Sequence, residues 1–187
     1  MREGSIVLLA IIMGLMLAFD MGGPVNKVAY AFMLICVSQG IYSVVAIAAV
    51  GIAIPPLGMG LATLVGRKYF SAEERETGKA ALVMGCVGVS EGAIPFAAAD
   101  PLRVIPSIMI GAASGCVTTA LLGAQCYAGW GGLIVLPVVQ GKGGFIAGLL
   151  VGACVTAACV ITLKALTKKK TPAAKADDEL DLDFEIN

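Results

Sequence analysis

The sequence predicts an all-α integral membrane protein, a polytopic helical bundle with broken helices and re-entrant hairpins. Apolar residues make up 58% of the 187-residue chain and charged residues only 14%, whereas soluble domains are about 25% charged. The charges are also concentrated, because residues 67–79 hold seven of the 26 and residues 168–187 hold ten. The remaining stretches are long, apolar and interrupted by glycine and proline, which a membrane tolerates where protein or a cavity satisfies the freed backbone groups.

The first three apolar stretches differ in length. Residues 5–19 fall short of the ~20 residues that a crossing helix needs, and we expect a membrane helix that ends at the glycine–proline break after it. Residues 28–36 form a second short stretch. Residues 41–65 are long enough to cross, but Pro55 and Pro56 remove two backbone donors, so this helix is predicted to be broken and kinked at its centre.

Residues 67–79 form the one strongly polar internal loop. Within it, Ser71 followed by Glu74 is a capping box, which predicts a short surface helix. Four basic residues in this loop and the three lysines at 168–170 place both segments on the cytoplasmic side, since cytoplasmic loops of membrane proteins are enriched in Lys and Arg. An even number of crossings must therefore separate the two segments.

Residues 102–122 and 143–166 are each long enough to supply one of these crossings. Residues 80–99 and 130–139 must then either enter and leave by the same face or stay at a membrane interface, and their glycines and prolines favour re-entrant hairpins. Spacing typical of closely packed membrane helices occurs twice, in the pairs Gly111 with Gly115 and Gly148 with Gly152.

The chain divides into a membrane domain, residues 1–167, and a charged cytoplasmic tail, residues 168–187. The polar and acidic composition of the tail predicts disorder. A docking peptide is the alternative interpretation, because apolar residues alternate with acids between residues 180 and 186.

Several kinds of chemistry are excluded by what the sequence lacks. It contains no histidine, and its six cysteines form no CxxC pair, so no metal site is predicted and the cysteines are interpreted as small packing residues. No catalytic motif of a hydrolase or a nucleotide-binding enzyme occurs, and no catalytic residue is predicted. The low share of charged residues also excludes a nucleic-acid binder that relies on a basic face.

The first candidate site surrounds the break at residues 20–27, where Asp20, Asn26 and Lys27 flank a glycine–proline segment. One interpretation is a loop at the membrane surface with two solvated charges. The other is an unwound backbone segment at membrane depth that binds a polar ligand.

The second candidate site is Glu91 with its neighbours Ser90 and Gly92. Glu91 is the only charged residue between Lys79 and Asp100, and a carboxylate in such apolar surroundings is by default functional. It can accept hydrogen bonds from two adjacent sugar hydroxyls, or bind a cation or a proton, and the residues alone do not separate these roles. Farther on, Asp100 and Arg103 are three residues apart, so we expect a structural ion pair near the site that caps the next helix, with direct ligand contact as the alternative.

Three blocks of the sequence resemble one family. Residues 20–27, Asp-Met-Gly-Gly-Pro-Val-Asn-Lys, resemble a signature of the fructose-type membrane component, enzyme IIC, of the bacterial phosphoenolpyruvate-dependent sugar phosphotransferase system. Residues 53–60 look like the next shared block, and residues 88–106 are similar to the family's glutamate-bearing sugar motif. The resemblance runs from roughly residue 5 to residue 166.

The resemblance implies an all-helical transporter of the bacterial inner membrane, usually a dimer, that moves a sugar inward. Phosphate from phosphoenolpyruvate reaches the sugar through a histidine on subunit IIA and a cysteine on subunit IIB, so this chain needs no cofactor of its own. Glu91 corresponds to the sugar-binding glutamate. IIA and IIB are expected to be separate proteins that act as partners of this chain. Membrane lipid is expected to surround it.

Two departures from the family pattern affect the interpretation. Gly129 and Trp130 stand where the pattern has proline and histidine, so Trp130 either stacks on a sugar or anchors the chain at the interface, and the substrate is expected to be fructose or a fructose-like hexose derivative. The Asp20 motif also comes early in the chain. The sequence therefore resembles the C-terminal half of the component, and we expect either a separate N-terminal IIC half or a truncated product.

The predicted function is a membrane subunit that translocates a sugar while IIA and IIB phosphorylate it. Two alternatives remain open from the residues. One is a membrane scaffold or degenerate half-subunit that does not transport, and the other is an ion-coupled carrier in which Glu91 is the proton site.

Overall fold

The computed structural model describes residues 3–170, with side chains for residues 4–167. The elements in chain order are α1 (Glu3–Phe19), α2 (Pro24–Ser38), α3 (Tyr42–Val65), η1 (Arg67–Tyr69), α4 (Ala72–Val87), η2 (Ser90–Ala93), α5 (Ile94–Ala99), α6 (Pro101–Leu121), β1 (Gln125–Cys126), η3 (Leu133–Val138), β2 (Val139–Gln140) and α7 (Lys142–Lys170). The predicted all-α membrane fold is confirmed. Helix α7 continues past the predicted domain boundary at residue 167, and the rest of the tail lies outside the described residues.

Among the described residues, three helices are long and apolar enough to cross a membrane: Tyr42–Val65, Pro101–Leu121 and Lys142–Thr167. They coincide with the three predicted crossings. Helix α3 forms the centre of the bundle, since 89% of its apolar window is buried, compared with 44% for α6 and 39% for α7. Helices α6 and α7 therefore keep a face toward the surroundings, whereas α3 contacts protein on every side.

The predicted break at Pro55 and Pro56 does not occur, because α3 is helical from Tyr42 to Val65. The physical reason is the dense packing of neighbours around the prolines. A Cβ placed on Gly92 of η2 would lie 3.1 Å from the Cβ of Pro56, and one on Gly85 of α4 would lie 2.6 Å from the Cγ of Leu57. Neighbouring helices that enclose such a segment hold the backbone in place where an isolated helix would break.

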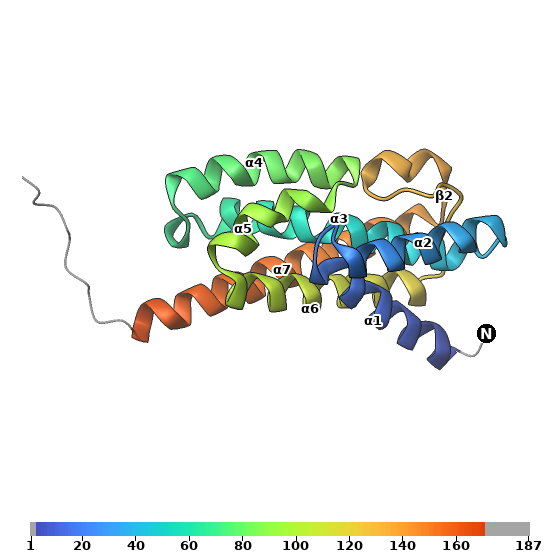
Figure 1. Ribbon diagram of the computed structural model, residues 1–187, viewed down its shortest axis with the longest axis horizontal. Coiled ribbons are helices and arrows are strands. Elements are labelled where there is room, and N and C mark those ends of the chain that lie inside the picture. Colours follow the sequence, from blue (N-terminus) through green and yellow to red (C-terminus); the bar gives the residue numbers. More distant parts are fainter. Residues whose placement is uncertain (1–2, 171–187) are drawn as a thin grey trace, which may run out of the picture.

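Two helical hairpins enter the bundle from opposite ends (Figure 1). Helices α1 and α2 enter and leave at the end where the N-terminus lies, and α4 and α5 do so at the other end. The predicted hairpin at residues 80–99 is thereby confirmed, although it starts earlier. The predicted short surface helix is in fact α4, a 16-residue arm of this hairpin, because its polar first turn continues into an apolar second half that packs on α3.

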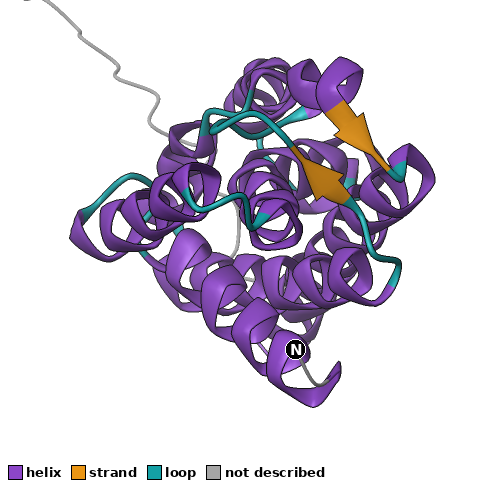
Figure 2. Cartoon of the chain, turned by 90° about the vertical axis from the view of Figure 1, so that its right-hand side faces the viewer, coloured by secondary structure: helices purple, strands orange, loops and turns teal. Residues whose placement is uncertain are grey.

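A third, smaller hairpin closes the end near the N-terminus (Figure 2). Strands β1 and β2 pair antiparallel, with Gln125 opposite Gln140 and Cys126 opposite Val139. The ring of Tyr127 contacts that of Tyr42 at 4.3 Å between centroids, which joins this hairpin to the start of α3. The segment 130–139 therefore enters and leaves by the same face, as predicted.

Glycine allows α6 and α7 to pack backbone against backbone, as their spacing predicts. A Cβ on Gly115 would lie 2.6 Å from the carbonyl oxygen of Gly148, and one on Gly152 would lie 2.9 Å from that of Gly111. Real Cβ atoms do not approach so closely. Small residues at a helix interface permit this separation, and the resulting van der Waals contact stabilises helix pairs in membranes.

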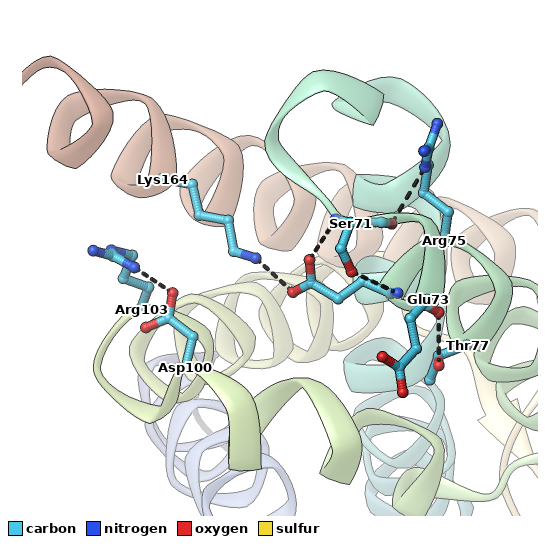
Figure 3. Close-up of polar contacts among 8 residues, drawn as sticks. Ser71, Glu73, Arg75, Thr77, Asp100, Arg103 and Lys164 are labelled. Carbon is cyan, nitrogen blue, oxygen red and sulfur yellow. Dashed lines mark hydrogen bonds and ion pairs between the residues drawn. The ribbon is translucent and has the colours of Figure 1, made fainter. Parts of the chain in front are cut away.

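The opposite end of the bundle is joined by a polar network (Figure 3). Glu74 accepts a hydrogen bond from the backbone N–H of Ser71 at 2.8 Å, and the Ser71 hydroxyl accepts one from the N–H of Glu74 at 3.1 Å, so the capping box is confirmed. The other carboxylate oxygen of Glu74 accepts a hydrogen bond from Lys164 of α7 at 2.8 Å. Asp100 and Arg103 pair at 2.6 Å, and Arg103 also donates to Thr167 at 3.3 Å.

Replacing Lys164 by methionine is expected to lower the free energy of unfolding by roughly 1–3 kcal/mol, because it leaves the Glu74 carboxylate without its cation in a partly buried place. The side chains of Lys164 and Glu74 are 12% and 24% exposed. The matched control is Lys79→Met, since Lys79 and Glu76 are 61% and 73% exposed and such pairs contribute about 0–1 kcal/mol. Equal shifts of both variants in thermal unfolding in detergent would contradict this expectation.

Candidate functional site

The tips of the hairpins meet at a pocket of about 280 Å³ beside the middle of α3. Its walls come from residues within 22–30, from Ile52 of α3, from residues 88–91 and from residues 130–131. Ile52 is ten residues from the start of α3 and thirteen from its end, which corresponds to about 15–20 Å of helix on either side. The pocket therefore lies near mid-depth of the central crossing.

Glu91 lies at the tip of the α4–α5 hairpin and touches the tip of the α1–α2 hairpin. Gly22 has a φ of +101°, and a Cβ on it would lie 2.6 Å from the Oε1 of Glu91. The carboxylate thus packs directly against the backbone of residue 22, and only glycine, which has no side chain, leaves room for it there. The Ser90 hydroxyl lies 3.5 Å from the Oε2 of Glu91, and Glu91 is exposed toward the pocket.

Asp20 stabilises the start of α2 at the same break. Its two carboxylate oxygens accept hydrogen bonds from the backbone N–H groups of Val25 at 2.7 Å and Asn26 at 2.9 Å. A negative charge at this position satisfies the free amides of α2 and interacts favourably with the helix dipole. Asp20 therefore holds the start of α2 and does not line the pocket.

Asn26 and Lys27 follow this cap, and both line the pocket. The side-chain amide of Asn26 is buried and donates a hydrogen bond to the carbonyl of Leu17 at 2.6 Å, which ties α2 to the end of α1. Lys27 is exposed. The first turn of α2 thus presents to the pocket one anchored amide and one cation, Lys27, that forms no ion pair with any residue the structure describes.

Trp130 is held in place by three contacts. Its indole N–H donates a hydrogen bond to the carbonyl of Val87 at 2.7 Å, at the end of α4. The ring of Tyr30 meets it edge to face, with centroids 6.3 Å apart, and the Tyr30 hydroxyl donates to the carbonyl of Gly129 at 3.0 Å. Trp130 therefore lines the pocket as a fixed aromatic wall, still 45% exposed.

The remaining predicted residues lie outside the pocket. Gly92 is buried behind Glu91, against Met84 and Pro56. The Asp100–Arg103 ion pair lies at the far end of α5, and neither residue lines the pocket. The pair was expected near the site, but α5 carries it to the end of the bundle where Ser71 and Lys164 lie.

Tyr30 lines the pocket although the sequence analysis did not single it out. The spacing contains a usable signal, because Tyr30 comes four residues after Asn26 and three after Lys27, which places all three on one face of a helix. Ile52 and Gly131 give no such signal. They reach the pocket only because the loop at Gly131 packs against α3, where the N–H of Gly132 donates to the carbonyl of Ala49 at 3.2 Å.

Replacing Gly22 by alanine is expected to weaken ligand binding about tenfold, because the new methyl group displaces the Glu91 carboxylate as well as straining a backbone with positive φ. Gly40→Ala is the matched control. Gly40 has a φ of +72°, but a Cβ there would meet nothing closer than 4.0 Å. Thermal unfolding should show a common loss of stability in both variants, and a ligand-binding measurement should show a loss of binding for Gly22→Ala alone.

Many membrane transporters bind their substrates at mid-depth between discontinuous helices, and the pocket between the hairpin tips of this bundle resembles that arrangement. Comparison with known proteins agrees. The chain is 78% identical, over its full length, to the Fructose-like permease IIC component 2 of Escherichia coli (strain K12), and covers 52% of that protein. It is 38% identical to the PTS system fructose-specific EIIC component of Haloferax volcanii, with 94% of the chain and 47% of that protein covered.

A third relative joins several subunits in one chain. It is the PTS system fructose-specific EIIABC component of Bacillus subtilis (strain 168), 41% identical over 89% of the chain and 26% of that protein. No family profile and no solved structure matches the chain. The chain is therefore a homologue of the fructose-type IIC membrane components of the phosphotransferase system, and it spans about half the length of the curated relatives it matches.

Proposed function

We propose that this chain forms part of a membrane component that translocates fructose or a fructose-like hexose derivative inward, coupled to phosphorylation of the sugar by IIA and IIB subunits. The observation that carries this proposal is the meeting of hairpin tips at mid-depth, which brings Glu91, Lys27 and Trp130 into one pocket. The names of the relatives agree with a fructose-type substrate.

The pocket has the chemistry that a sugar requires. The carboxylate of Glu91 accepts hydrogen bonds from hydroxyls, and the hydroxyl of Ser90 in the same lining can donate or accept them. The fixed ring of Trp130 offers an apolar surface on which the C–H face of a sugar ring can pack. The bound sugar would then lie between two hairpins that open toward opposite ends of the bundle, an arrangement suited to alternating access.

The chain corresponds, in this proposal, to the C-terminal half of a IIC component, and a separate N-terminal half completes it. Lys27 and Glu91 are exposed on the open side of the pocket. Two charged side chains at mid-depth are costly against lipid. The half of the relatives that this chain does not cover would close that side, and the complete component would form a dimer.

The orientation follows from the basic residues. Arg67, Lys68, Arg75 and Lys79 lie at the end of the bundle where the α4–α5 hairpin begins, and the last turns of α7 lie beside them. We propose that this end faces the cytoplasm of a bacterial cell, with the C-terminus on the same side. The IIB subunit would then deliver its phosphoryl group, derived from phosphoenolpyruvate, from this end.

The test is phosphoenolpyruvate-dependent uptake of labelled fructose and related hexoses into membrane vesicles. The vesicles contain the general phosphotransferase proteins, IIA, IIB and this chain, with or without the remaining half of the E. coli relative. The expected result is that sugar phosphate accumulates in the vesicles that contain both this chain and the remaining half. Uptake that needs a proton gradient but no phosphoenolpyruvate would identify an ion-coupled carrier, and no uptake by the correctly inserted protein would identify a scaffold.

A further inference from the structure

Lys27 and Glu91 are opposite charges in one pocket that do not neutralise each other. Both line the pocket, yet neither lies within 4.0 Å of an oppositely charged group of any described residue. Three other cations of the bundle, Lys79, Arg103 and Lys164, do form ion pairs. The pocket thus keeps one anion and one cation available for its ligand.

A neutral sugar does not need both charges. The hydroxyls of a hexose are satisfied by a carboxylate and by neutral polar groups, and the pocket already offers Glu91, Ser90 and the backbone at its tip. Phosphorylation changes the requirement, because a phosphate monoester carries about −1.5 to −2 charges at pH 7. Beside the carboxylate of Glu91, such an anion is disfavoured unless a cation faces it.

We propose that Lys27 binds the phosphoryl group of the sugar phosphate formed in this pocket, while Glu91 binds hydroxyls of the sugar itself. The inference rests on the proposed function. It divides the site into a subsite for the neutral sugar at the α4–α5 tip and a subsite for an anion on the first turn of α2. Lys27 is then a specificity-determining residue for the phosphorylated ligand.

The backbone that carries Lys27 is fixed on both sides, as an anion subsite requires. The preceding residue, Asn26, is anchored to Leu17 through its side chain and to Asp20 through its backbone N–H. Three residues later, Tyr30 is anchored to Gly129. Only the side chain of Lys27 remains to be ordered on binding, and its ammonium group is the cation of this subsite, because the carboxylate of Asp20 already accepts hydrogen bonds from the first amides of α2.

The experiment measures competition against exchange of labelled fructose in vesicles that contain the complete component, made of this chain and the remaining half of the E. coli relative. The competitors are fructose, fructose 1-phosphate, fructose 6-phosphate and inorganic phosphate. The variants are Lys27→Met, Lys27→Arg and, as the matched control, Lys142→Met, which removes an exposed cation at the start of α7 outside the pocket.

We expect Lys27→Met to weaken competition by a fructose phosphate at least tenfold more than competition by fructose. Lys27→Arg should restore the wild-type ratio within about threefold, and Lys142→Met should leave that ratio unchanged. The ester whose competition is weakened selectively identifies the hydroxyl that is phosphorylated. If competition by inorganic phosphate is weakened as well, the subsite recognises the phosphate group without the sugar.

Equal losses for fructose and its phosphates in Lys27→Met, with fructose exchange intact in the wild type, would overturn the role of Lys27 and leave the proposed function standing. Failure of Lys27→Arg to restore the ratio would also overturn it, because the charge would then not be the cause. A wild-type component that exchanges no fructose would overturn the proposed function and this inference together.

Discussion

Replacing Glu91 by glutamine is expected to lower phosphoenolpyruvate-dependent sugar uptake roughly 100-fold. The substitution keeps the size of the side chain but removes its charge, so each of two hydroxyl hydrogen bonds loses about 1–1.5 kcal/mol, the difference between charged and neutral acceptors. The sum of 2–3 kcal/mol corresponds to roughly 30- to 150-fold in binding. Uptake of labelled fructose by the complete component, with protein amounts matched, measures the effect.

The matched control is Glu73→Gln. Glu73 is exposed on the first turn of α4 and does not line the central pocket, so its substitution should leave uptake within about twofold of the wild type. If Glu91→Gln behaved like this control, Glu91 would not receive the sugar. If the loss appeared only in the presence of a proton gradient and vanished when the gradient was collapsed, Glu91 would instead be a proton site.

Replacing Gly88 by alanine is expected to destabilise the protein by roughly 3 kcal/mol or more and to abolish uptake. Gly88 ends α4 with a φ of +85°, a conformation that costs an L-residue about 1–2 kcal/mol. A Cβ there would also overlap the backbone carbonyl of Gly131. Backbone atoms cannot rotate away as a flexible side chain can, so the two hairpin tips would have to separate.

Gly123→Ala isolates the backbone contribution. Gly123 has a φ of +65°, and a Cβ there would meet nothing within 4 Å, so only the cost of about 1–2 kcal/mol applies. Thermal unfolding in detergent compares the two variants. Trp130 fluorescence reports on the tip of the α4–α5 hairpin, because the indole N–H donates to the carbonyl of Val87, the residue before Gly88. Identical unfolding of both variants would show that the contact with Gly131 contributes nothing.

The crossings and two of the three hairpins were predicted from local sequence, whereas the hairpin of α1 and α2 was not. A membrane imposes a length on each apolar segment, and residues 41–65, 102–122 and 143–166 satisfy it. The capping box at Ser71 was equally readable, because its two hydrogen bonds form within four residues. Glu91 was identifiable by its isolation, since an unpaired charge in an apolar stretch is costly wherever it is placed.

The composition of the pocket was decided by contacts between segments distant in the chain. Asp20 and Glu91 are both acids beside glycine, but only the fold makes one a helix cap and the other a pocket residue. Pro55 and Pro56 remain within α3 because helices from other parts of the chain enclose them. The pocket residues 22, 91 and 131 are up to about 110 positions apart, so no local periodicity relates them.

By itself, the sequence determined the membrane fold class, the crossing segments, the hairpins at residues 80–99 and 130–139 and the family resemblance, because hydrophobic length, capping and glycine–proline breaks are local properties. The tertiary structure alone decided that the hairpin tips meet, that Tyr30 fixes Trp130, and that Lys27 and Glu91 share a pocket without pairing. These features depend on which surfaces pack together. Glycines such as Gly22 and Gly131 allow these surfaces to pack, because they lack a side chain where a residue far away in the chain comes close to their backbone.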